Sequence, residues 1–232
     1  MLALIVLALM LFASPSWAAI TCTGTSFPFN APSNPQTQAY TVPSVTNGVT
    51  FIGFSIRPDT RTVVGTPTLG GITLTHVGAR AVSTDTATDV YQLINAASGS
   101  QTISIQYSAA PLSLVVTAVT CDNVDQATPV SSTTTATGSG TSVTVNCAGT
   151  TGGLVLDFAA ADQNSSLTTG AGQTNIDQDV ADGVLAAGAS REAGAATVTM
   201  SHTISNSSNW GTVCLALKEA AASIFGLQRR MP

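Results

Sequence analysis

The apolar and polar residues of this chain alternate as they do in β-strands. Ile103, Ile105 and Tyr107 are separated by polar residues, which is the period of two expected for a strand with one buried face. Nine segments mix β-branched, aromatic and alternating residues in this way: 49–56, 71–78, 89–96, 101–108, 112–121, 141–147, 153–161, 196–204 and 210–218. Clusters of Gly, Pro, Asn and Ser, such as "NAASGSQ" and "SNSSN", separate them. Many short strands without helical segments predict an all-β fold, a two-sheet antiparallel sandwich of jelly-roll type.

Three stretches do not follow this pattern. Residues 20–48 are rich in Pro and Asn, and we expect a wandering first strand there. Residues 174–194 fit either a strand pair or a long loop, and the tail "EAAASIFGLQRRMP" fits a short helix. The expected organisation is an N-terminal extended segment at 19–48, one β-sandwich domain at 49–218 and a C-terminal tail at 219–232.

The first residues, "MLALIVLALMLFASPSWAA", have the pattern of a secretory signal peptide. Residues 2–12 form an apolar run that is too short for an ordinary membrane anchor. Ser16 and Ala18 place small side chains where signal peptidase requires them, so we predict cleavage after Ala18. The segment lacks Lys and Arg, so either the α-amino group supplies the usual charge or the true start lies upstream. The prediction is an exported protein with a signal peptide at 1–18; a buried N-terminal helix is the alternative.

Charge is sparse along the whole chain. The 232 residues include 7 Lys and Arg and 12 Asp and Glu, for a net charge of −5. Nucleic-acid binding requires cations along the phosphates, so no nucleic-acid partner is expected. No apolar run after the leader is long enough to span a membrane. Thr, Ser, Ala and Gly dominate instead, and such a neutral, hydroxyl-rich surface is typical of an extracellular protein or of one packed into an assembly.

Four cysteines remain after cleavage: Cys22, Cys121, Cys147 and Cys214. An even number in an exported chain indicates disulfides, whereas zinc is the weaker alternative because no CxxC pair exists. Cys121 and Cys147 are placed symmetrically about "PVSSTTTATGSG", which fits a hairpin loop between antiparallel strands. The expected pairs are therefore Cys121–Cys147 and Cys22–Cys214, and the other two pairings remain open.

Five motifs occur along the chain in this order: "DVYQLINAASGSQTISI", "NVDQATPV", "GLVLDFAAAD", "GAGQT" and "WGTVCLALK". Together they resemble a β-sandwich module of many bacterial secreted and surface proteins, which often occurs in multidomain chains. The resemblance covers residues 53–218. It implies the sandwich fold, brings no catalytic residues and is nearly silent on function. The cysteines and the tail are not part of the module's pattern.

The stretch "CDNVDQATP" at 121–129 gathers Asp122, Asn123 and Asp125 in a chain with few charges. It follows an apolar strand and ends at Pro129, which cannot continue a central strand. Asp and Asn side chains bind nearby backbone amides and tolerate turn conformations. We therefore predict a structural corner here rather than a catalytic or metal site.

The segment "DQDVADG" is the best candidate for a metal site. Asp177, Asp179 and Asp182 precede Gly183, so three oxygen donors could converge on Ca²⁺ in a loop. The spacing is not that of an EF-hand, and the bidentate Glu of such a loop is absent. The alternative is a solvated acidic loop.

Catalytic machinery is not expected. The two histidines, His76 and His202, lie in strand patterns, and no G-x-S-x-G motif is present. A triad assembled by long-range folding is the alternative. Glycoside hydrolysis requires two facing carboxylates, whereas Glu192 is the one Glu of the sandwich region and most Asp residues lie in loops. We predict neither enzyme activity nor a cofactor.

Sugar binding by a sandwich usually relies on exposed aromatic rings. Tyr91, Tyr107 and Trp210 lie in strand patterns and are expected in the core or at a sheet edge, and Tyr40 alone lies in a loop-like stretch. The expected function is an exported structural or adhesive protein, such as a self-assembling filament or surface-layer subunit, secreted or at the cell surface. Its expected partners are further copies or another surface component, with end segments lent to a neighbour's sheet edge. The alternative is a monomeric module that binds a glycan or another surface partner.

Overall fold

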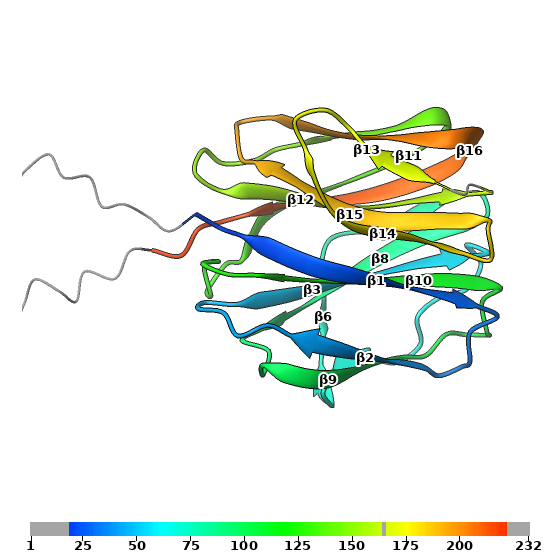
Figure 1. Cartoon of the computed structure of the whole chain (residues 1–232), viewed down its shortest axis with the longest axis horizontal. Helices are drawn as coiled ribbons and strands as arrows, with labels where there is room; N and C mark the ends of the chain where they lie inside the picture. The colour runs from blue at the N-terminus through cyan, green and yellow to red at the C-terminus, as the bar shows by residue number, and fades with distance from the viewer. Residues whose placement is uncertain (1–18, 164–165, 222–232) are drawn as a thin grey trace, which may run out of the picture.

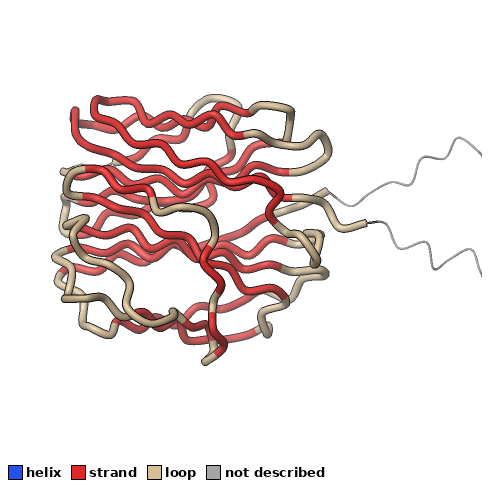
Figure 2. The backbone as a smooth tube through the Cα atoms, turned by 180° about the vertical axis from the view of Figure 1, so that it is seen from behind, coloured by secondary structure: helices blue, strands red, loops and turns tan. Residues whose placement is uncertain are grey.

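The computed structural model describes residues 19–163 and 166–221, so the predicted signal peptide and most of the tail lie outside the described residues. The described residues form strands and loops and no helix (Figures 1 and 2). Within these ranges, therefore, no helix has the length and hydrophobicity needed to cross a bilayer. The predicted all-β antiparallel sandwich is confirmed, and it contains three sheets rather than two.

The middle sheet has six strands. In spatial order these are β1 (Cys22–Asn30), β10 (Ser113–Cys121), β3 (Val49–Arg57), β8 (Thr86–Ile94) and β6 (Thr75–His76), with β7 (Ala81–Ser83) also paired with β8. β3 and β10 are buried at nearly every position, because other strands cover both faces of the sheet. This double burial explains why "VTFIGFSI" and "LSLVVTAVTC" are almost continuously apolar.

The lower sheet covers one face of the middle sheet (Figure 1). Its four strands are, in order, β2 (Gln36–Val42), β9 (Gly99–Ile105), β4 (Thr68–Leu69) and β5 (Ile72–Thr73). Tyr40 and Ile103 are buried against Phe54 and Leu114 of the middle sheet. The segment at 19–48 thus supplies two integral strands, β1 and β2, and Tyr40 lies in a strand rather than in a loop.

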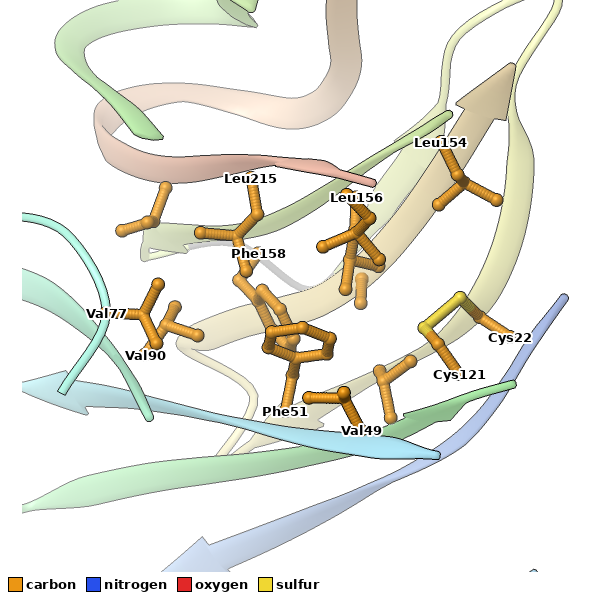
Figure 3. Close-up of a cluster of buried hydrophobic side chains, with 14 of the residues drawn as sticks. Cys22, Val49, Phe51, Val77, Val90, Cys121, Leu154, Leu156, Phe158 and Leu215 are labelled. Atoms are coloured by element: carbon orange, nitrogen blue, oxygen red, sulfur yellow. A yellow bond between two sulfur atoms is a disulfide. The ribbon is translucent and has the colours of Figure 1, made fainter. Parts of the chain in front are cut away.

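The upper sheet covers the other face. Its strands are, in order, β11 (Val130–Cys147), β16 (Val198–Leu217), β12 (Leu154–Asp162), β15 (Leu185–Ala193) and β14 (Thr174–Ala181), with β13 (Leu167–Thr169) paired with β16. Phe51 of the middle sheet meets Phe158 and Leu215 of the upper sheet in the core (Figure 3). The Phe158 ring lies on Gly53, where a Cβ would come within 2.4 Å of it. The close approach of the two sheets at this point therefore requires glycine.

The two longest strands, β11 and β16, each serve two layers. The register of their pairing shifts between Gly140 and Ser142. Beyond this bend, residues 142–147 and 198–204 fold back over the upper sheet together with β13 and form an outer layer (Figure 1). The buried residues that join this layer to the upper sheet include Val145, Cys147, Val198, Met200, Val155 and Cys214. The molecule is therefore a stack of lower sheet, middle sheet, upper sheet and outer layer.

All four cysteines are in disulfides, but the predicted pairing is wrong. The bonds are Cys22–Cys121 and Cys147–Cys214, where the sequence predicted Cys121–Cys147 and Cys22–Cys214. The reason is that residues 130–140 form the first half of β11 and pair with β16 instead of making a hairpin loop. Cys22 lies directly opposite Cys121 on paired strands, with their Cα atoms 4.1 Å apart. Cys147 is folded back over Cys214, so this bond fastens the outer layer to the upper sheet.

Candidate functional site

The stretch at 121–129 is a corner that ties the chain ends to the sandwich. Asp122 Oδ1 accepts hydrogen bonds from the backbone N–H and the hydroxyl of Thr21, at 2.7 and 2.8 Å. Asn123 has a φ of 53°, which Asn tolerates better than most residues, and its carbonyl accepts from the N–H of Ala220. The first and last described residues therefore lie side by side at one end of the stack, here called the corner end (Figure 1).

Asp125 completes the corner. Its Oδ1 accepts from the backbone N–H groups of Ala127 and Thr128, at 2.9 and 2.7 Å, and its Oδ2 lies 3.4 Å from Nζ of Lys218. The hydrogen bond from Thr128 is the main reason why the pKa of the Asp125 carboxyl is lowered from its ordinary value. The prediction of a structural corner is confirmed, because both carboxylates are engaged with the backbone.

An open cavity of about 480 Å³ lies beside this corner. It is lined by Thr150, Thr151, Gly152, Gly153, Lys218 and Glu219. The described residues of the lining include no histidine, no cysteine and no second carboxylate beside Glu219, so they offer neither a nucleophile with its base nor a set of metal ligands.

The acidic segment "DQDVADG" closes an edge of the middle sheet. Asp177 Oδ2 accepts a hydrogen bond from the backbone N–H of Ser26, on the edge strand β1, at 2.6 Å. Asp179 accepts from the N–H of the next residue at 2.7 Å, and the backbone N–H of Asp182 donates to the side chain of Asn30. Among the described residues, no three Asp, Glu, His or Cys side chains are grouped so that they could hold a metal ion. The structure does not bring Asp177, Asp179 and Asp182 together as the predicted calcium site requires.

Asp157, His202 and Ser190 form a buried network between the upper sheet and the outer layer. His202 Nε2 is 2.8 Å from Asp157 Oδ2, and the Ser190 hydroxyl donates to Asp157 Oδ1 at 2.7 Å. The side chains of His202 and Asp157 are 1% and 0% exposed. A hydrolase triad needs the histidine between nucleophile and acid, whereas here the acid is in the middle and is closed off from substrate. The network fastens the outer layer, and its one sequence signal is a lone acid in the apolar strand "GLVLDFAAA".

Asp89, Arg80 and His76 form a second network beside β8. Asp89 Oδ2 is 3.0 Å from Arg80 Nε, and Asp89 Oδ1 is 3.3 Å from His76 Nε2. Burial raises the pKa of the Asp89 carboxyl, and the charges of Arg80 and His76 oppose that rise. Arg80 also donates to two backbone carbonyls of the loop at 58–62, and His76 packs on Tyr91. These contacts hold the loop after β3 against β8.

The tyrosine and tryptophan rings of the described residues are buried. Tyr107, Tyr40, Trp210 and Tyr91 are 1%, 5%, 7% and 8% exposed. Tyr91, Tyr107 and Trp210 lie in the core, the first of the two places expected for them, and the Tyr40 hydroxyl bonds to that of Thr120 at 2.9 Å. None of these four rings is placed to stack on a sugar.

The outward positions of the lower sheet carry uncharged hydroxyl side chains, here called the lower face. The strand register aligns Thr37, Ser104, Thr68 and Thr73 in one row across all four strands. The next two rows pair Ala39 with Thr102 and Thr41 with Ser100. These residues are exposed or half-exposed, and none of the hydrogen bonds formed within the described part of the chain engages their hydroxyls.

The outward positions of the outer layer repeat this pattern and are here called the upper face. Its rows are Thr168–Thr203–Ser142, Ser201–Thr144 and Thr199–Asn146, and all of these residues are uncharged and exposed or half-exposed. The Thr199 hydroxyl donates to Asn146 Oδ1 at 2.8 Å. Because the lower sheet and the outer layer are the first and last layers of the stack, the two faces point in opposite directions (Figure 1).

The chain's own side chains occupy part of two sheet edges. On the edge strand β2, Gln36 Nε2 donates to the carbonyl of Thr37 at 2.9 Å, and Gln38 Nε2 donates to that of Ala39 at 2.8 Å. On the edge strand β1, one backbone group is occupied, the N–H of Ser26, which donates to Asp177 Oδ2. An open edge binds another strand through its unpaired backbone groups. Occupying such groups disfavours strand addition at these two edges.

Comparisons with protein-family models, with curated proteins and with solved structures gave no match for this chain. The fold, the two disulfides and the two hydroxyl-bearing faces are the observations on which a functional proposal has to rest.

Proposed function

We propose that this chain is an exported structural or adhesive protein that meets its partners through its lower and upper faces. Export is supported by the leader-like sequence at 1–18 and by two disulfides, which persist in oxidising compartments. The resemblance of residues 53–218 to a β-sandwich module of bacterial secreted and surface proteins accords with a place outside the cell.

The observation that carries the proposal is the separation of charge from the two faces. No charged residue occupies an outward strand position on either face. The charged side chains of the described residues lie instead in the core, at the corner end, in the loop at 57–62, at 80–85 and along β14 and β15. Each hydroxyl can donate and accept hydrogen bonds, so such a face makes many weak contacts without a pocket. This suits a structural or adhesive role better than the capture of a small molecule.

The scaffold behind the faces supports the same role. The bond between Cys147 and Cys214 fastens the outer layer that carries the upper face, and the bond between Cys22 and Cys121 fastens the first strand to its neighbour. The buried Asp157–His202 pair adds a polar contact between the outer layer and the upper sheet. The disulfide and the buried pair thus hold the outer layer on the upper sheet, and a hydrophobic core joins the lower sheet to the middle sheet.

The proposal is tested with the mature, oxidised protein, residues 19–232. Light scattering on size-exclusion fractions measures self-assembly, and co-sedimentation with washed cell envelopes of the producing organism measures adhesion. The double variant Thr102→Lys/Thr144→Lys places one charge on each face, and Thr151→Lys places the same charge at the corner end as a control. We expect the wild type and the control to assemble or co-sediment and the double variant to do neither. A wild type that is monomeric and remains in the supernatant, or a double variant that behaves like the wild type, contradicts the proposal.

A further inference from the structure

We infer that both faces bind a neutral, hydroxyl-rich polymer, a polysaccharide without charged groups, and that one molecule bridges two such polymers. The inference rests on the proposed function, because it takes the lower and upper faces as the contact surfaces.

The chemistry of the rows fits a polyol. Hydroxyl side chains stand at intervals of about 4.8 Å across the strands and about 6.8 Å along them, and each offers one donor and two acceptor positions. A sugar hydroxyl offers the same set, so protein and polymer can satisfy each other in either direction. The lower face has four such groups in one row, Thr37, Ser104, Thr68 and Thr73. Since no cation stands on either face, a polyanion has no ionic contact to gain there.

A second copy of the chain fits these faces less well. The core of a stable protein–protein interface is enriched in aromatic residues, Met and Arg and depleted in Ser. On the lower face, Ala39 is the one apolar residue among the aligned rows, and the upper face has none. Strand addition is also disfavoured at β1 and β2, where side chains already bind edge groups.

The ligand must be extended rather than a free sugar. Tyr40, Tyr91, Tyr107 and Trp210 are buried, so among the described residues no tyrosine or tryptophan ring supplies the stacking energy that holds a single sugar. One neutral hydrogen bond contributes little net free energy in water. Useful affinity therefore requires several rows to be engaged at once, which a polymer or a polymer surface allows.

The opposed orientation of the faces leads to bridging. The lower face and the upper face lie on opposite sides of the stack (Figure 1), so they cannot both rest on the same flat surface. Each molecule that uses both faces therefore joins two polymer chains or particles, and many molecules together cross-link them.

The test uses suspended particles of cellulose and of chitin as neutral probes and alginate beads as the anionic probe. The full mature protein is compared with Thr102→Lys, which charges the lower face, Thr144→Lys, which charges the upper face, the double variant, and the corner-end control Thr151→Lys. Circular dichroism and the melting temperature establish that each variant is folded. Bound protein is measured in the pellet, and bridging is measured as aggregation of the particles.

We expect the wild type and the control to bind and aggregate neutral particles equally well in low and high salt. Each single-face variant should bind nearly as well as the wild type through its unchanged face but should aggregate the particles much less. The double variant should bind about tenfold less, because its faces together have lost one or two hydrogen bonds. No binding to either neutral probe, a preference for alginate, or full aggregation by a single-face variant overturns the inference.

If polysaccharide binding fails while face-dependent self-assembly is intact, the partner is a second copy and the proposed function stands. If both fail, both the inference and the proposed function are wrong.

Discussion

The corner end and the lower face use polar side chains in opposite ways. At the corner, Asp122 and Asp125 each accept backbone hydrogen bonds and are thereby committed to the fold. On the lower face, Thr37 and Ser104 stand opposite each other on paired strands, and their hydroxyls have no hydrogen-bond partner among the described residues. The clustered acids of the corner are therefore structural, although clusters of acids are rare in a chain with so few charges. The hydroxyls of the lower face, in contrast, remain available for contact.

Among side chains that hold the fold together, the loss of a disulfide should have the largest effect on the free energy of unfolding. Replacing both Cys147 and Cys214 by Ala opens a link across a sequence separation of 67 residues, for which chain entropy predicts a loss of about 4 kcal/mol in the free energy of unfolding. Urea denaturation measures it. The matched variant lacks Cys22 and Cys121, whose separation is 99 residues, and should lose a similar amount. Unchanged stability in either variant would show that its disulfide constrains the chain much less than the fold implies.

The next largest effect is expected at Asp157. An Asp157→Ala variant leaves His202 Nε2 and the Ser190 hydroxyl buried without their acceptor, which should destabilise the protein by about 3 kcal/mol. Asp157→Asn keeps one acceptor oxygen and should lose less. The midpoint of urea unfolding distinguishes them. An Ala variant as stable as the wild type would mean that this network does not hold the outer layer.

A smaller, pH-dependent effect is expected at Asp125. Asp125→Ala removes two turn hydrogen bonds and should reduce stability by about 1 kcal/mol at pH 7. Because the pKa of Asp125 is lowered in the folded protein, its contribution is present above the unfolded pKa of about 4 and is lost as the pH falls through the lower folded value. The melting temperatures of the wild type and the Asp125→Ala variant should therefore differ at pH 7 and converge at pH 2. A difference that persists at pH 2 would assign the loss to something other than the carboxylate.

Asp89 should respond to pH with the opposite sign. Burial raises the pKa of its carboxyl in the folded protein, so its protonation favours folding. Relative to Asp89→Asn, the wild type should gain stability as the pH falls through this raised value, with the gain complete below about pH 4. Thermal unfolding of both proteins between pH 7 and pH 4 measures the effect. A shift in the same direction as at Asp125 would contradict the burial argument.

The smallest effect on stability is expected on the faces themselves. Thr102→Lys lies at an exposed strand position whose hydroxyl has no partner in the described chain, so its free energy of unfolding should stay within about 0.5 kcal/mol of that of the wild type. Urea denaturation checks this alongside the binding assays. A clear loss of stability would show that Thr102, like Asp122 and Asp125 at the corner, holds the fold together, and would contradict the contrast between the two regions.

The strand pattern predicted the fold class because burial imposes a local period. Ile103 and Ile105 alternate with polar residues since one side of β9 faces the core. The turn at Asp125 was predictable because its carboxylate binds the backbone of its own neighbours, whereas the hydrogen bonds from Thr21 to Asp122 join residues far apart in the sequence. That the cysteines form disulfides was predictable from their even number, but their pairing was not, because "PVSSTTTATGSG" resembles a loop but is paired along its length with β16. Nor were the hydroxyl rows: Thr37 and Ser104 become neighbours only through the register of strands far apart in the sequence.

The most direct test of the claim that contact is made by the faces uses Lys218, the single lysine of the chain. It lies at the corner end, and its side chain is 52% exposed. The rate at which its amine is acetylated, followed by mass spectrometry, should be the same in the free protein and in the protein bound to neutral polysaccharide particles or to further copies. A rate that falls severalfold on binding would place the contact at the corner end and contradict the account.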